Sequence, residues 1–219
     1  MEFAEGYLRI GTWNAIPVRV HWTAPIGIFV FSGLHLAPAV WFGVALVIFI
    51  HEVGHAVVVR RCAATPTSID FTGIGGECHW YGVVGRFERC LIAWGGVAAQ
   101  TVLLAATCAV TSLLKGPQST VAHDLVSAFL MSNALMVIVN LLPFRPLDGR
   151  EAWRIVPIGL WELMRVLRRA YERVSARVTL RRLERLEGSD KVPALPPDIR
   201  EQLERVCEVG RGSVDDDRA

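Results

Sequence analysis

Residues 51–55 place two histidines and a glutamate in the short sequence His-Glu-Val-Gly-His. On a helix His51 and His55 are four positions apart, so both imidazoles project from one face and can bind one metal ion. Glu52 follows His51 directly and can reach a water molecule on that metal to accept its proton. The spacing therefore predicts a zinc (Zn2+) site with a general base beside it.

The residues before this motif are apolar without interruption from Trp41 to Ile50. Ionisable groups at the end of such a run are costly in a bilayer, and groups of that kind usually serve a function. A single buried histidine is more often a satisfied core residue than a metal ligand. Two histidines at helical spacing with a glutamate between them favour the metal site.

Composition indicates a membrane protein. Hydrophobic residues make up 52% of the 219 residues, and the mean hydropathy is +0.37. The apolar residues cluster in long blocks, which predicts several transmembrane helices in a lipid bilayer. Residues 1–21 lack a leading apolar core, so we expect no cleavable signal peptide. The five cysteines include no Cys-x-x-Cys pair, which argues against a disulfide framework, and we expect no nucleic-acid partner.

The order of apolar blocks and turn residues predicts an all-α polytopic membrane protein with about four transmembrane helices. Gly- and Thr-rich residues 62–88 interrupt the helices and predict a small membrane-associated β-hairpin between the second and third. Residues 1–21 are expected to be a polar lead-in with a short strand or interfacial segment at 18–21. The predicted helices cover residues 22–36, 39–60, 90–114 and 121–142.

The C-terminal part is more polar. Residues 152–170 combine an apolar stripe with several arginines, which favours an amphipathic helix on the bilayer surface over a fifth span, although the sequence leaves both open. From residue 171 the pattern is that of a soluble helical tail that ends in the acidic run 215–217. We therefore expect a membrane core at 1–170 and a tail at 171–219.

Arginine placement predicts the topology. With four spans, nearly all arginines of the connecting segments fall on one side of the membrane, and the other side carries only Lys115, His123 and Asp124. The positive-inside rule makes the arginine-rich side cytoplasmic. The metal would then lie within the membrane, toward its cytoplasmic face, and we expect a multi-pass protein of the plasma membrane.

A catalytic zinc site generally needs a third protein ligand. The fourth predicted span ends at the same depth, in Asn140-Leu-Leu-Pro-Phe-Arg-Pro-Leu-Asp-Gly149. Prolines stop the helix there, and Gly149 permits a tight reversal that can direct Asp148 inward. Considered without the histidine motif, Asp148 could equally be part of an ordinary Asp-Gly turn. Glu151 and Glu77 are then the alternative third ligands.

Together, the two motifs resemble the site-2 protease family of intramembrane zinc metalloproteases. The likeness covers about residues 20–150, and it implies that His51, His55 and Asp148 bind zinc and that Glu52 is the general base. Asn140 corresponds to the asparagine of the family motif near the substrate backbone. Gln100, in Gly96-Val-Ala-Ala-Gln100, stands where the family has an asparagine and keeps an amide for substrate peptide groups.

By this resemblance we expect hydrolysis of a peptide bond in or near the transmembrane segment of a single-pass membrane protein, which releases a cytoplasmic fragment. Two other functions are possible: a zinc-binding membrane scaffold or pseudo-protease that does not cut, and a metal or proton transporter. Glu52 argues against the scaffold, because ligands alone do not need that acid. Transport would require polar residues spread along several spans, whereas these gather at one depth. The sequence does not indicate the oligomeric state.

Overall fold

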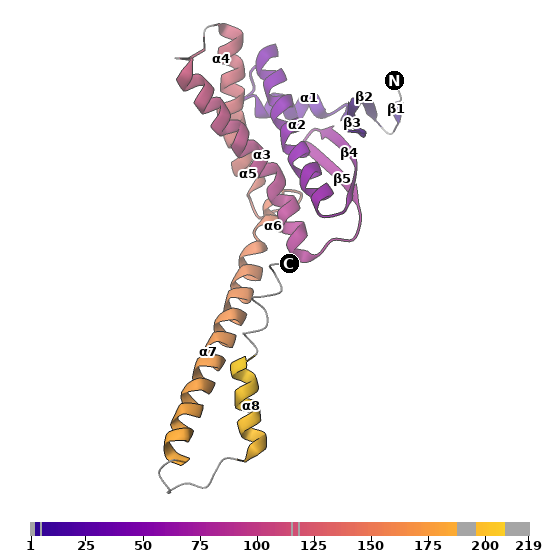
Figure 1. The fold of residues 1–219 in the computed structure, drawn as a ribbon. Coiled ribbons are helices and arrows are strands. Elements are labelled where there is room, and N and C mark those ends of the chain that lie inside the picture. The colour runs from indigo at the N-terminus through magenta and orange to yellow at the C-terminus, as the bar shows by residue number, and fades with distance from the viewer. Residues whose placement is uncertain (1–2, 5, 115, 118, 188–195, 209–219) are drawn as a thin grey trace. The chain divides into compact units, whose positions relative to one another are not determined.

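The computed structural model describes residues 3–4, 6–114, 116–117, 119–187 and 196–208. The chain forms two compact units, 1–155 and 156–219. The first unit contains a small sheet and the membrane helices, and Figure 1 shows its elements. In chain order the strands and helices of this unit are β1 (Phe3–Ala4), β2 (Tyr7–Trp13), β3 (Ile16–His21), α1 (Ala24–Phe31), α2 (Pro38–Arg61), β4 (Thr65–Thr72), β5 (Gly75–Tyr81), α3 (Arg86–Leu113), α4 (Thr120–Ser127), the π-helical turn η1 (Ala128–Ser132), α5 (Asn133–Asn140) and α6 (Gly149–Ala152).

Three helices are long and apolar enough to cross a membrane, among the residues that the structure describes: α2, α3 and the continuous segment Thr120–Asn140. Their limits lie within a few residues of the predicted helices at 39–60, 90–114 and 121–142. The first predicted helix, 22–36, is only the eight-residue α1. At about 1.5 Å per residue α1 spans roughly 12 Å, too short to cross. The predicted number of about four transmembrane helices is therefore wrong by one.

The predicted hairpin is present as β4 and β5, which pair antiparallel between α2 and α3. It does not stand alone, however. β3 pairs in parallel with β4, and the order of the mixed sheet is β1-β2-β3-β4-β5, with the two-residue β1 at one edge. The predicted all-α class and the isolated hairpin are both corrected: most of the N-terminal lead-in belongs to the sheet.

One face of the sheet packs on α2. Ile16 and Val18 of β3 and Ile69 of β4 are buried in one cluster with Val44 and Val47 of α2. A part-buried ion pair also joins the strands, because Arg19 Nε donates to Asp70 Oδ1 over 2.7 Å and Asp70 is 1% exposed. These contacts fix the sheet beside the helix that carries the histidine motif.

Helices α2 and α3 approach each other closely through glycines. A Cβ on Gly95 would lie 2.7 Å from the backbone oxygen of Gly54, and a Cβ on Gly54 would collide with the backbone oxygen of Gly95. Only glycine at both positions allows the two backbones to touch. Small residues of this kind are typical of helix contacts in membranes.

The second unit consists of α7 (Ile155–Glu187), which begins at the unit boundary, and α8 (Pro197–Glu208). The predicted amphipathic segment 152–170 falls mostly on the N-terminal half of α7, and its position on a bilayer stays a prediction. The predicted boundary at residue 170 between a membrane core and a soluble tail also stays a prediction. Helices at 171–187 and 197–208 agree with the predicted helical pattern, and the acidic run 215–217 lies outside the described residues.

Candidate metal centre

The two histidines lie on one face of α2, and each is held by a hydrogen bond from its Nδ1. His51 Nδ1 donates to Gln100 Oε1 over 3.0 Å, and His55 Nδ1 donates to the backbone oxygen of Ile92 over 2.6 Å. Both acceptors belong to α3, and an oxygen of this kind can only accept, so each Nδ1 carries the proton. A neutral imidazole with its proton on Nδ1 has a free lone pair on Nε2, and this is the form that binds metals.

Asp148 reaches the same point from the loop after α5. It precedes the single turn α6, the N-cap position at which an aspartate usually accepts hydrogen bonds from the helix, yet its side chain makes no capping bond. Instead Asp148 Oδ2 lies 2.9 Å from His51 Nε2 and 3.1 Å from His55 Nε2. This geometry excludes the ordinary Asp-Gly turn as the explanation of Asp148.

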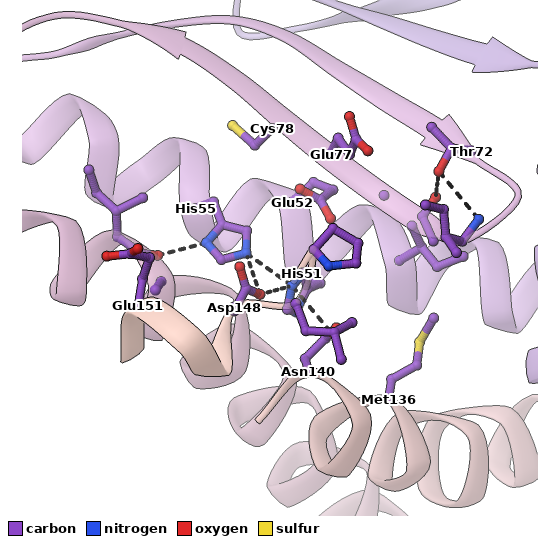
Figure 2. Close-up of a pocket in the computed structure, with 18 of the residues that line it drawn as sticks. His51, Glu52, His55, Thr72, Glu77, Cys78, Met136, Asn140, Asp148 and Glu151 are labelled. Carbon is purple, nitrogen blue, oxygen red and sulfur yellow. Dashed lines mark hydrogen bonds and ion pairs between the residues drawn. The ribbon is translucent and has the colours of Figure 1, made fainter. Parts of the chain in front are cut away.

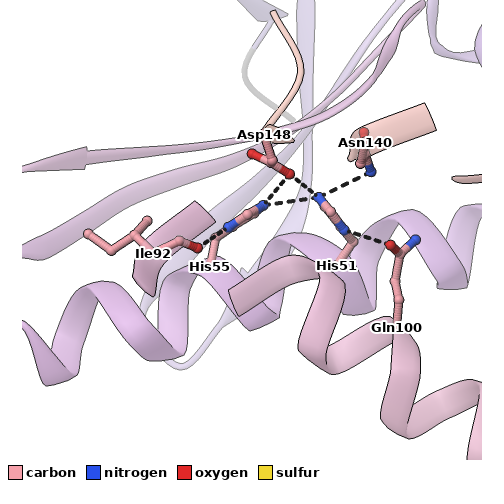
Figure 3. Close-up of polar contacts among 6 residues, drawn as sticks. All are labelled: His51, His55, Ile92, Gln100, Asn140 and Asp148. Carbon is pink, nitrogen blue, oxygen red and sulfur yellow. Dashed lines mark hydrogen bonds and ion pairs between the residues drawn. The ribbon is translucent and has the colours of Figure 1, made fainter. Parts of the chain in front are cut away.

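Three electron-pair donors therefore converge, as Figure 3 shows. The two Nε2 atoms are 3.0 Å apart. Neighbouring ligands of a tetrahedral zinc ion are roughly 3.3 Å apart, given zinc–nitrogen bonds of about 2.0 Å. The donor set and spacing thus fit a divalent metal. Among the described residues, this is the one group of three such side chains with ligand atoms within 4.8 Å of one another, so Glu77 and Glu151 do not join it.

Electrostatics favour a charged carboxylate at this point. Burial raises the pKa of Asp148, but the neighbouring His51 and His55 lower it more, and the net pKa lies well below its ordinary value. Asp148 is therefore ionised at neutral pH and available as an anionic ligand. Burial also raises the pKa of the nearby Cys78 thiol, to about 12, so Cys78 carries no charge there.

Gly96 of α3 provides the space that the imidazoles occupy. A Cβ at this position would lie 2.5 Å from both His51 Cε1 and His55 Nε2. Real contacts at such positions are about 3.5–4.0 Å, so any larger residue would displace a ring. This role of Gly96 was not predicted, because nothing local in the sequence shows which helix faces the histidines.

Glu52 faces the same cavity of about 460 Å³, which is lined by α2, α3, the β4–β5 hairpin and the loop of Asp148. The Glu52 side chain is 3% exposed and contacts the backbone of Gly76 in β5, where a Cβ would collide with its carboxylate. Figure 2 shows Glu52 next to the imidazoles, on the side of the hairpin. The general base predicted from the sequence is thus in the same cavity as the three candidate ligands.

The two amides expected to bind substrate both contact His51. Asn140 Nδ2 lies 3.4 Å from His51 Nε2 and lines the cavity. Gln100 is fully buried; its Oε1 is used by His51, and its Nε2 has no partner among the described residues. Gln100 thereby has a role that was not predicted, as the acceptor that orients His51. Substrate binding by either amide stays a prediction.

Comparison with known proteins agrees with this geometry at the level of fold. The structure is similar to that of the Site-2 Protease from Methanocaldococcus jannaschii, with a TM-score of 0.52 over 80% of this chain and 83% of that chain. The chain has the fold of a site-2 protease. Sequence identity is 18%, so the likeness shows the fold alone. The sequence matches no family model and no curated protein.

Proposed function

We propose that this protein is an intramembrane zinc metalloprotease. The observation that carries the proposal is the convergence of His51, His55 and Asp148 beside the buried Glu52, with both histidines and Glu52 on a helix long and apolar enough to cross a membrane. Two imidazoles and one carboxylate leave a fourth position of a tetrahedral ion open, which is the pattern of catalytic zinc sites. The similarity in fold to a site-2 protease supports the same function.

Bound zinc would supply a Lewis acid that polarises the scissile carbonyl and lowers the pKa of a coordinated water molecule toward 7. The residues of the chain would do the rest. Glu52 accepts a proton from the attacking water on its carboxylate and later delivers it to the nitrogen of the leaving amine. Gln100 and Ile92 keep the protons of both imidazoles on Nδ1, away from the metal side.

A peptide bond inside a transmembrane helix is protected by the hydrogen bonds of that helix, so the substrate must unwind locally. Freed backbone groups need partners in the cavity. We propose Asn140 for this role, because its side-chain amide lies beside His51 Nε2 in the cavity. We also propose Gln100, because its Nε2 has no partner among the described residues. Strand β5 lines the cavity as the last strand of the sheet, and its outer edge offers further backbone groups to an extended substrate.

The expected substrate is a single-pass membrane protein, cut near the cytoplasmic face so that a cytoplasmic fragment is released. Two arginines at the C-terminal end of α2, Arg60 and Arg61, support this orientation by the positive-inside rule. We propose the plasma membrane as the location.

A direct test is to incubate the purified protein in lipid nanodiscs with a fluorescent transmembrane-helix substrate. We expect zinc-dependent cleavage that a chelator abolishes and that Glu52→Gln reduces by at least ~10²-fold, since a general base contributes roughly 10²–10⁴-fold. Cleavage that survives both treatments would refute the protease mechanism. Zinc binding with no cleavage of any helix substrate would favour the non-catalytic scaffold.

A further inference from the structure

The segment that carries Asp148 is short and mostly irregular. It runs from the end of α5 at Asn140 to the start of α7 at Ile155 and contains only the single turn α6. Residues 142–146 are exposed. Metal–ligand distances must hold within about 0.2 Å, so contacts outside the irregular segment have to fix the carboxylate.

Two indole N–H groups make these contacts. Trp94 Nε1 of α3 donates to the backbone oxygen of Ala152 over 3.0 Å, and Trp153 Nε1 donates to the backbone oxygen of Leu141 over 2.7 Å. The rings meet edge to face, with centroids 5.9 Å apart. The first bond ties the end of the segment to α3, and the second ties that end to its beginning.

The turn α6 transmits this restraint to Asp148. The backbone oxygen of Asp148 accepts from the N–H groups of Glu151 and Ala152, each over 2.9 Å. Ala152 is fully buried, and a Cβ on Gly149 would collide with the backbone oxygen of Leu141. These contacts fix the geometry of the turn, so the position of the Ala152 carbonyl constrains that of Asp148.

Helix α3 then serves as a common reference for all three candidate ligands. It holds His51 through Gln100 and His55 through Ile92, and it holds the turn of Asp148 through Trp94. We propose that Trp94 and Trp153 are positioning residues that set metal affinity by fixing Asp148 through their indole N–H groups. This inference rests on the proposed ligand role of Asp148.

Phenylalanine variants test the inference, because they keep an aromatic ring and remove only the N–H donor. The zinc dissociation constants of Trp94→Phe and Trp153→Phe are measured by chelator competition in nanodiscs. We expect about tenfold weaker binding for each, the lower end of the range for residues outside the ligand set. The visible absorption spectrum of the cobalt-loaded protein should shift toward that of Asp148→Asn. Trp161→Phe is the control, since Trp161 is an exposed residue of α7 and should leave affinity and spectrum unchanged.

The outcomes separate this inference from the proposed function. If Asp148→Asn weakens zinc binding and both phenylalanine variants bind as the wild type with its cobalt spectrum, the positioning role is refuted and the ligand set stands. If Asp148→Asn itself binds zinc normally, the proposed metal centre is refuted. Should Trp94→Phe fail to fold, Trp153→Phe decides, because its donor bond lies within the segment and not between helices.

Discussion

Replacing Gly96 by alanine should remove the metal without unfolding the protein. The added Cβ would lie 2.5 Å from His51 Cε1 and from His55 Nε2, and 2.6 Å from His51 Nε2. An ordinary contact is about 1 Å longer. Moving the helices apart to relieve this would give up the close contact between Gly95 and the backbone of Gly54 and the hydrogen bonds from α2 to Gln100 and Ile92. The imidazoles must therefore move.

Gly96→Ala should affect the free energy of unfolding far less than it affects zinc affinity. Overpacking typically lowers the free energy of unfolding by about 1–3 kcal/mol, and alanine in place of glycine within a helix recovers about 1 kcal/mol. We thus expect a net loss of about 0–2 kcal/mol. A ring displaced by about 1 Å, however, exceeds the tolerance of a metal bond several-fold, so we expect zinc affinity to fall more than ~100-fold.

The assay compares zinc content, zinc dissociation constant and thermal unfolding of the metal-free protein for Gly96→Ala and the wild type. Gly159→Ala is the matched control, because Gly159 is also helical and a Cβ there meets nothing within 4 Å. It should raise stability slightly and leave zinc affinity unchanged. Stoichiometric zinc bound at wild-type affinity by Gly96→Ala would refute the arrangement of α3 against the histidines.

Three further changes test other parts of the structure. Gly76→Ala would displace the Glu52 carboxylate, so we expect at least ~10-fold slower cleavage and a zinc affinity within about twofold of the wild type. Loss of cleavage and zinc affinity together would contradict the inference that Glu52 is positioned separately from the metal ligands. Arg19→Met leaves the buried Asp70 carboxylate without its guanidinium and should lower the free energy of unfolding by about 2 kcal/mol, measured by thermal or denaturant titration; an unchanged value would show that this ion pair contributes nothing. Burial raises the pKa of Cys78 from 9.0 to about 12, so its neutral thiol contributes stability that is complete below pH 9 and lost as the pH rises to 12. Alkylation of Cys78 at pH 8 should therefore be far slower in the native than in the denatured protein. Equal alkylation rates would refute the burial of Cys78.

Local periodicity was sufficient for the elements that depend on neighbouring residues. The helix of the histidine motif was predicted at 39–60 and lies at 38–61, because a long apolar run between Pro38 and two arginines leaves little freedom. His51 and His55 were correctly placed on one face for the same reason, since four residues make about one helical turn.

Contacts between distant segments were harder to predict. β3 pairs with β4 across about 50 residues, through a register that sets Arg19 opposite Asp70. The middle of β2 is exposed from Arg9 to Thr12, so burial does not alternate along this strand, and its short apolar–polar pattern did not identify it. The length of α1 was overestimated, because the apolar residues continue beyond the end of the helix. Gly33 and Leu34 adopt positive φ angles there and end it.

The third ligand could be predicted only from its expected depth in the membrane and from the resemblance to the family motif. Asp148, 93 positions after His55, could have been a turn residue, and the structure distinguishes the two cases by the direction of its carboxylate. Trp94 and Trp153 were not predicted at all. A tryptophan in or near a membrane segment is common at interfaces, and only the position of its N–H shows that it holds a loop.

The glycine contact between α2 and α3 links the folding of the helix pair to the chemistry of the histidines. In lipid, close backbone packing is a main source of helix association, and here Gly54 and Gly95 provide it. The same approach brings Ile92 and Gln100 within 3.0 Å of the two Nδ1 atoms. A larger residue at Gly54 would separate the helices and break both hydrogen bonds, so the imidazoles would lose their fixed tautomers as well as their position. Formation of the helix pair therefore already directs both Nε2 atoms into the cavity, and the proposed zinc ion would enter a site whose two candidate nitrogen ligands are in place.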